Sequence, residues 1–195
     1  MRDNPRRLWL KRHNPQFFRL RKGVILDSQQ GRWECRAMGN MFLLSFPFRQ
    51  QVQCSRSLSQ SEIDARKAVV LRLAAQGYVT ISAAISEGEK QIVRAVREAG
   101  HPLVILLKDG FPAKDSPHER YYKPSGIYFD ACAEGRLLLL EPFDSVYASP
   151  AIANAVYRKS PFAPRNSQRY RFLALNTIAN ALSKEEVRVS VEQHV

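Results

Sequence analysis

The chain has 195 residues, 45% of them hydrophobic, which is enough apolar material for one folded domain and excludes wholesale disorder. Its net charge of +12 favours an anionic partner, with nucleic acid ahead of an acidic membrane surface. The longest apolar runs, PLVILL and LLLL, are far too short to cross a membrane, and the N-terminus lacks the long apolar segment of a secretory signal.

Cysteine and histidine spacing gives no metal or disulfide pattern. Cys35, Cys54 and Cys132 are widely separated, so they match neither a disulfide framework nor a zinc site, and a reducing cytoplasm is the expected location. The four histidines are scattered, and no HExxH or GxSxG motif occurs. Asp130 and Glu134 stand one helical turn apart, so they could be either a catalytic pair of carboxylates or part of a solvated helix face. We therefore predict no cofactor and no metal, and the residues favour a protein that is not an enzyme without deciding the question.

Residues 1–38 are basic and lack a sustained period. Residues 1–40 contain ten Arg and Lys residues and three acidic residues, which gives a net charge of +7, whereas residues 41–195 have a net charge of +5. Pro5 and Pro15 interrupt any helix. We predict a poorly ordered basic leader over residues 1–38. An arm that binds nucleic acid through its cations and aromatic rings, and an organelle transit peptide, remain alternatives.

The stretch from residue 51 to residue 110 alternates between strand and helix patterns. We predict three strands and two helices, in the order Val52–Cys54, helix Ser61–Gln76, Tyr78–Ser82, helix Ser86–Ala99 and Pro102–Leu107. This alternation is typical of βαβ units with a parallel sheet, and such sheets bind ligands at the carboxyl ends of their strands. We therefore expect the ligand at Ser55-Arg56, at Ser82 to Ser86 and at Lys108-Asp109.

The start of each predicted helix can be interpreted in two ways. Ser55 and Arg56 precede the first helix, where they could hold a phosphate or form a solvated surface turn. Ser59 and Ser61 are both possible N-caps of that helix, with Ser61-x-x-Asp64 as a capping pattern.

The second helix opens on the capping box Ser86-x-x-Glu89. Ser82, Ser86 and Lys90 could contact phosphate there, but Glu87 and Glu89 in the first turn repel an anion. A binding turn and a structural cap are therefore equal alternatives at this position.

The rest of the chain continues the α/β pattern. Two segments rich in Pro and charge are predicted as exposed loops, Asp109–Gly126 and Ala148–Arg169. The remaining elements are expected to be a helix at Ile127–Glu134, a buried strand at Arg136–Phe143, a helix at Arg171–Ser183 and an edge strand at Glu185–Val191.

Several short strings, in order, resemble the DNA-processing protein DprA/Smf family, and more closely the short DprA-like proteins of Bacteroides-type bacteria. The resemblance covers residues 39–183. It is carried by GNMFLLSFP at 39–47, CSR at 54–56, ISAAISEGEK at 81–90, HPLVILLKDGF at 101–111, YYKPSG at 121–126, FDACAEG at 129–135, RLLLLEP at 136–142 and LNTIANALS at 175–183.

The resemblance implies a Rossmann-like three-layer α/β fold with a mostly parallel sheet, truncated relative to full DprA, with residues 184–195 as a tail or edge strand. It implies binding of single-stranded DNA near the strand ends and delivery to a RecA-type recombinase during natural transformation. A homodimer could cover the edge of the shortened sheet.

By position, Ser55 and Arg56 match the Ser-Arg of the family, Ser82 its strand-end Ser and Asn176 the Asn of its last motif. Two positions depart from the family. Ala83 stands where the family has Gly, and Leu175 where it has Arg, although Arg171 lies one turn earlier.

We thus expect a non-enzymatic protein that binds DNA phosphates through Arg56, Lys90, Lys108 and Arg171, with Ser55, Ser82, Ser86 and Asn176 beside them. The alternative is a nucleotide-binding sensor or a hydrolase of the LOG type, although the PGGxGTxxE motif of those enzymes is absent. A module for assembly, with an unoccupied strand-end surface, is the third interpretation.

Overall fold

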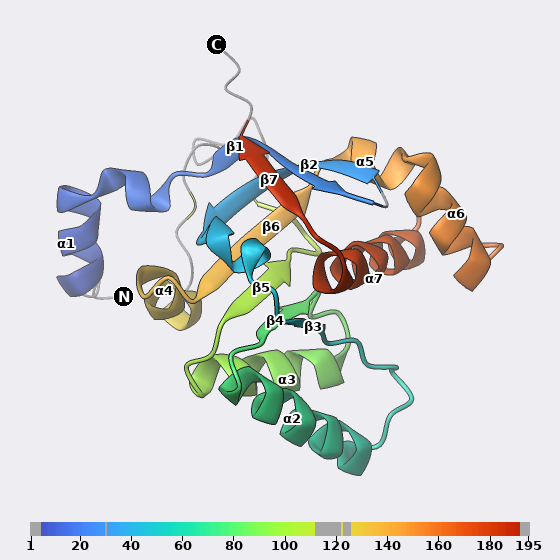
Figure 1. Ribbon diagram of the computed structural model, residues 1–195, viewed down its shortest axis with the longest axis horizontal. Coiled ribbons are helices and arrows are strands. Elements are labelled where there is room, and N and C mark those ends of the chain that lie inside the picture. The colour runs from blue at the N-terminus through green and yellow to red at the C-terminus, as the bar shows by residue number, and fades with distance from the viewer. Residues whose placement is uncertain (1–4, 30, 112–121, 123–125, 192–195) are drawn as a thin grey trace.

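The computed structural model describes residues 5–29, 31–111, 122 and 126–191. A seven-stranded sheet, with the order β3-β4-β5-β6-β2-β1-β7, runs through the middle of the molecule (Figure 1). Its strands are β1 (Arg21–Ser28), β2 (Gly31–Gly39), β3 (Arg49–Gln51), β4 (Val79–Ser82), β5 (Leu103–Leu106), β6 (Leu137–Pro142) and β7 (Arg188–Val191).

One half of the sheet is parallel and follows chain order. Strands β3, β4, β5 and β6 pair in parallel, and the described residues of each connection form one helix: α2 (Gln60–Ala75), α3 (Glu87–Glu98) and α4 (Gly126–Ala133). Strands β4 and β5 are buried along their whole length. Leu103 and Ile105 pack with α2, α3 and α4, whereas Val104 and Leu106 pack in the core on the other face. Alternate side chains of β5 therefore pack into two hydrophobic cores, one on each face of the sheet.

The other half of the sheet is antiparallel, which corrects the expectation of a mostly parallel sheet. Strand β2 pairs antiparallel with β6, β1 with β2, and β7 with β1. The sheet is therefore mixed, and the expectation of an edge strand near residues 185–191 is confirmed by β7.

The prediction of a poorly ordered leader is wrong for residues 21–38, because they form most of the β1–β2 hairpin. Val24 and Leu26 are fully buried, and so are Trp33 and Cys35 of the second strand. Polar and apolar residues do not alternate clearly along these strands, because β2 is covered on both faces. Even Arg36 of β2 is buried, and it forms an ion pair with Glu141 of β6. Upstream of the hairpin the chain also has regular secondary structure, in α1 (Pro5–His13) and the 3₁₀ turn η1 (Pro15–Phe18).

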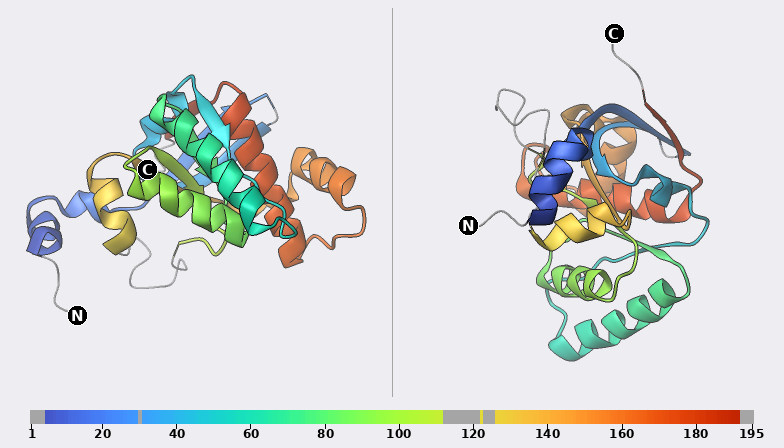
Figure 2. Two further views of the ribbon diagram at one scale, coloured as in Figure 1. Left: turned by 90° about the horizontal axis from the view of Figure 1, so that it is seen from below. Right: turned by 90° about the vertical axis from the view of Figure 1, so that its left-hand side faces the viewer.

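The second face of the sheet is covered by α7 (Gln168–Lys184), with the 3₁₀ turn η2 (Met41–Ser45), α5 (Asp144–Ala148) and α6 (Pro150–Lys159) around it. Helices thus lie on both sides of the sheet, and the described residues form three layers (Figure 2). The predicted loop at 148–169 is wrong over α6. Its Pro150 occupies the first helical turn, where proline is favourable, and Ile152 and Val156 are buried one turn apart.

Several boundaries shift by a few residues. The first parallel strand covers 49–51 rather than 52–54, because only the Val52 N–H continues the ladder, to the carbonyl oxygen of Ile81, before the chain leaves the sheet. Helix α2 is capped by Ser59 with Glu62, not by Ser61 with Asp64. The Ser86–Glu89 capping box, and the helices and strands predicted near α4, β6 and α7, are confirmed.

Most of the predicted loop Asp109–Gly126 lies outside the described residues. Its first residues are held in place, since Phe111 N–H donates to Oε2 of Glu141 at 2.7 Å. Within the described part of the chain, no helix is long and apolar enough to cross a membrane.

Candidate binding site at the carboxyl ends of the parallel strands

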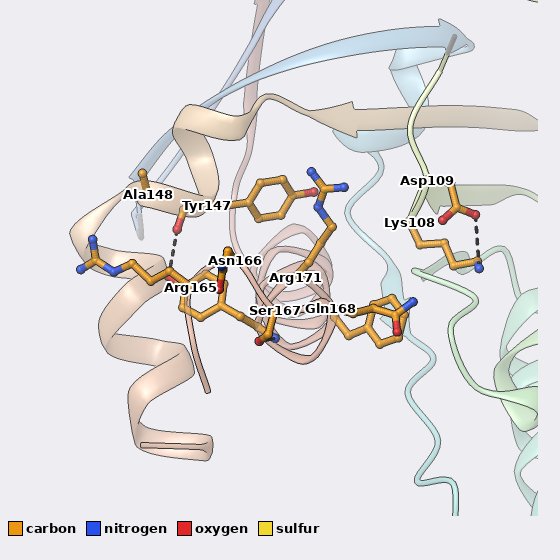
Figure 3. A pocket seen from close by; sticks show the side chains of 11 residues that line it. Lys108, Asp109, Tyr147, Ala148, Arg165, Asn166, Ser167, Gln168 and Arg171 are labelled. Carbon is orange, nitrogen blue, oxygen red and sulfur yellow. Dashed lines mark hydrogen bonds and ion pairs between the residues drawn. The ribbon is translucent and has the colours of Figure 1, made fainter. Parts of the chain in front are cut away.

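Two adjoining hollows flank the start of α7, next to the carboxyl ends of β3, β4 and β5. We call the larger one, of about 530 Å³, the Arg171 hollow (Figure 3). It lies between the end of β5, the end of α5 and the first turns of α7. Its lining residues are Lys108, Asp109, Tyr147, Ala148, Arg165, Asn166, Ser167, Gln168, Tyr170, Arg171 and Phe172.

The second, which we call the Arg56 hollow, has a volume of about 340 Å³ and lies between the loops after β3 and β4 and the same helix. Gln168 and Phe172 line both hollows, so the two are neighbours. The Arg56 hollow is lined by Cys54, Arg56, Ile85, Ser86, Glu89, Gln168, Arg169, Phe172, Leu173 and Asn176.

Cationic side chains outnumber acidic ones around the pair of hollows. Five cations line them, against the carboxylates of Asp109 and Glu89: Arg56, Lys108, Arg165, Arg169 and Arg171. They come from three segments that the fold brings to one edge of the sheet. The fold therefore brings together positive charges that lie far apart in the sequence.

Aromatic rings lie beside two of these arginines. The Arg171 guanidinium carbon is 5.1 Å from the centre of the Tyr147 ring, and Figure 3 shows the two side chains next to each other. The guanidinium of Arg56 is 5.8 Å from the centre of the Phe172 ring. Lys108, in contrast, forms an ion pair with Asp109 at 3.2 Å. Flat cation and ring surfaces of this kind can stack on nucleobases.

The start of α7 carries no acidic residue in its first turn. The hydroxyl of Ser167 caps it, accepting from the N–H of Tyr170 at 3.1 Å and donating to the carbonyl oxygen of Pro164 at 2.6 Å. The Tyr170 hydroxyl donates to the carbonyl oxygen of Tyr147 at 2.9 Å, which ties the end of α5 to the helix. The positive end of the helix dipole thus faces a hollow already lined by arginines.

The start of α3 has a different arrangement, because Glu89 occupies it. This carboxylate is buried, with 1% of the residue exposed, and its Oε1 accepts from the N–H of Cys54 at 3.1 Å. Its Oε2 accepts from the N–H of Ile85 at 2.6 Å, and from that of Ser86 at 3.4 Å. The backbone N–H groups at this turn, where a phosphate was expected, therefore bond to a carboxylate of the chain itself.

Three of the eight expected site residues lie outside both hollows. The Ser82 hydroxyl is buried, donating to the carbonyl oxygen of Val52 at 3.1 Å and accepting from the N–H of Ala84 at 3.0 Å. Ser55 bonds to Ser57 on the surface, and Lys90 pairs with Glu87 at 3.4 Å. The other five line a hollow: Arg56, Ser86 and Asn176 line one, and Lys108 and Arg171 the other.

Ala83 stands where the DprA/Smf sequences that this chain resembles have glycine. The left-handed backbone of this turn falls on Ala84, with φ of 48°, and not on Ala83. Glycine at position 83 is therefore not needed for the path of the chain.

Arg165, Arg169 and Phe172 are site residues that the sequence patterns did not indicate. All three lie within the run RNSQRYRF at 165–172, which spans the end of a predicted loop and the start of a helix expected to begin at Arg171. The pattern Ser167-x-x-Tyr170 ahead of an apolar stripe was the signal for an earlier helix start, because Ser is a favoured N-cap.

Cys54 lines the Arg56 hollow next to Glu89. Burial, and then the nearby carboxylate of Glu89, raise the pKa of its thiol above the ordinary value of a cysteine. The pKa of Cys132 is raised to about 12 by burial alone. No group of three or more His, Cys, Asp or Glu residues within the described ranges could hold a metal ion.

No family model, no curated protein and no solved structure matches the chain.

Proposed function

We propose that this chain is a DprA-like DNA-binding protein that holds the phosphates of single-stranded DNA across the carboxyl ends of its parallel strands. One observation carries the proposal: five cationic side chains surround two adjoining hollows at the start of α7. A run of phosphates is the ligand with a matching series of negative charges.

The arrangement of the parallel strands supports this assignment. The order β3-β4-β5-β6, with α2, α3 and α4 on one face, is similar to the arrangement expected for one half of a Rossmann-type doubly wound sheet. We infer a Rossmann-like core to which the β1–β2 hairpin and β7 add an antiparallel extension. In such sheets the edge at the carboxyl ends of the strands is the expected binding position.

Single-stranded DNA fits the aromatic component of the site. Phe172 lies between the two hollows, and Tyr147 lines the larger one. Unpaired bases stack on such rings, whereas the bases of a duplex are already stacked on each other. We therefore expect single strands to bind more tightly than duplexes of the same sequence.

The test is a fluorescence-anisotropy titration of a labelled single-stranded oligonucleotide over a series of salt concentrations. Combined Arg165→Ala and Arg171→Ala should weaken binding by about tenfold or more at low salt. They should also reduce the slope of log affinity against log salt by about two, one for each lost phosphate contact.

A double variant with the same loss of charge, Lys90→Ala with Arg94→Ala, is the control, because both residues are exposed on α3 and line neither hollow. It should bind nearly as the wild type does. Absence of binding at low salt, or equal weakening by the two double variants, would contradict the proposal.

A nucleotide-binding sensor is the second candidate, because the Arg171 hollow, at about 530 Å³, is within the usual size range of small-ligand pockets. A thermal-shift panel of mononucleotides separates the two functions. A shift with a mononucleotide, in a protein that does not bind oligonucleotides, would favour the sensor.

A further inference from the structure

The connection between α6 and α7 exposes an aromatic side chain almost completely. Phe162 is 95% exposed, the highest value among the large apolar side chains in the described part of the chain. Leaving a ring of this size in water is unfavourable, because the apolar area that a partner could cover is large. A partner that covers the ring would therefore be stabilised by its burial.

The connection holds this ring in a defined place. The N–H of Ala163 donates to the carbonyl oxygen of Ser160 at 3.2 Å, and the N–H of Ser167 donates to that of Pro164 at 2.9 Å, so the connection consists of two tight turns. Ala163 packs against the core on the face of the sheet that α7 covers. The chain thus anchors one residue and exposes its neighbour Phe162, so little ordering of the backbone is needed on binding.

The charge on both sides of the ring is positive. Residues 145–184 contain no Asp or Glu, and their six cations are Arg158, Lys159, Arg165, Arg169, Arg171 and Lys184. Arg158 and Lys159 are exposed in the last turn of α6, just before the connection, and Arg165 follows Phe162 by three residues. A ring between cations fits a ligand that combines flat apolar surfaces with a repeated negative charge, as a nucleic acid strand does.

The connection leads directly into the Arg171 hollow. Arg165 lines that hollow, and three residues of chain span at most about 11 Å, so Phe162 lies close to its wall. Helix α6 and the start of α7 pack together at one side of the molecule (Figure 1). A strand whose phosphates occupy the hollow therefore reaches the ring after a short length of its own backbone.

We propose that a single strand of DNA leaves the Arg171 hollow along the α6–α7 connection and stacks a base on Phe162. This inference rests on the proposed binding of single-stranded DNA and extends the site beyond the two hollows. An acidic membrane surface also attracts exposed aromatic rings and cations. A flat bilayer cannot enter the concave Arg171 hollow beside the ring, whereas a single strand can, so the strand is the partner that fits both features.

Tryptophan fluorescence tests the contact directly. In Phe162→Trp, addition of a single-stranded oligonucleotide should quench the new indole, because a stacked base lies against it. Phe42→Trp is the matched control, since Phe42 is 77% exposed in η2, next to the amino end of β6 at the opposite edge of the sheet. Trp9 and Trp33 are the same in both variants. Equal changes of fluorescence in the two variants would overturn the contact.

An anisotropy titration separates stacking from charge. Phe162→Ala should weaken binding of an oligonucleotide of about 16 nucleotides by about tenfold, as expected for the loss of one stacked base. The slope of log affinity against log salt should stay as in the wild type, since the ring contacts no phosphate. Phe42→Ala is the control and should keep the affinity of the wild type.

The outcomes separate this inference from the proposed function. Unchanged affinity in Phe162→Ala would overturn the stacking contact and leave DNA binding by the hollows intact. If the wild type binds no oligonucleotide, both proposals fail. In that case, sedimentation with vesicles of anionic phospholipid that is lost in Phe162→Ala would assign the connection to a membrane surface instead.

Discussion

Two helices begin at the same edge of the sheet, and their first turns differ in charge. Helix α3 opens on Ser86 with Glu87 and Glu89, and the buried carboxylate of Glu89 accepts from the amides of its own turn and of the loop after β3. Helix α7 opens on Ser167 with no acid in its first turn, and arginines stand on both sides of it. A helix start can bind a ligand anion only where the chain has not already supplied one.

The comparison also shows why position in a βαβ unit is insufficient to locate a site. The turn after β4 is the expected binding position of a parallel sheet, yet its donors are satisfied internally. Helix α7 enters from the opposite face of the sheet, after a long excursion through α5 and α6, and brings the open helix start to the same edge.

The largest effect is expected from removing the internal anion of α3. Glu89→Ala leaves three backbone N–H groups of a buried turn without their acceptor, and should lower the free energy of unfolding by about 3 kcal/mol. Urea denaturation followed by circular dichroism measures it. Glu87→Ala, in the same turn but exposed, is the control and should change stability little. Equal stability of the two variants would show that the Glu89 contacts contribute nothing.

Ser82 tests whether the end of β4 is structural. Ser82→Ala removes the buried hydroxyl that joins Val52 to Ala84, and should lower the free energy of unfolding by about 1.5 kcal/mol. Its oligonucleotide affinity should equal that of the wild type, since the residue lines neither hollow. A selective loss of DNA binding at unchanged stability would restore Ser82 to the binding site.

Making α7 resemble α3 should weaken DNA binding without unfolding the protein. Gln168→Glu places a carboxylate in the first turn of α7, between the two hollows, where it repels phosphate and competes for the arginines. We expect about a fivefold loss of oligonucleotide affinity at low salt, corresponding to about 1 kcal/mol. Gln60→Glu, the equivalent first position of α2, adds the same charge away from the hollows and should have a much smaller effect.

The smallest effect is a change in thiol reactivity that reports the charge of Glu89. Because burial and Glu89 raise the pKa of Cys54 above that of an ordinary thiol, its alkylation rate should still increase with pH where that of an ordinary thiol levels off. Glu89→Gln should lower that pKa and increase the rate at a fixed pH near neutrality. Peptide mass spectrometry after iodoacetamide treatment measures both rates.

Cys132 is the internal control for this measurement. Its pKa is raised to about 12 by burial alone, so a change confined to the charge of Glu89 should leave its alkylation rate as it was. Parallel increases at Cys54 and Cys132 would instead indicate that the variant opens the fold.

Local patterns determined much of the parallel half of the sheet. The runs PLVILL and RLLLLEP are apolar on both faces and short, as central parallel strands are, and they became β5 and β6. The pair Ser86 and Glu89 predicted the start of α3, because a capping box is formed by residues three apart within one turn. Such features depend on neighbouring residues, so the amino-acid sequence by itself specifies them.

The tertiary structure alone decided the antiparallel half and the charge of the site. Arg36 counts as a surface cation in any linear pattern, but in the fold it pairs with Glu141, more than a hundred residues away, and so β2 can be central. Arg56, Lys108 and Arg171 come together for the same reason, since only the packing of α7 against the sheet brings three distant segments to one edge.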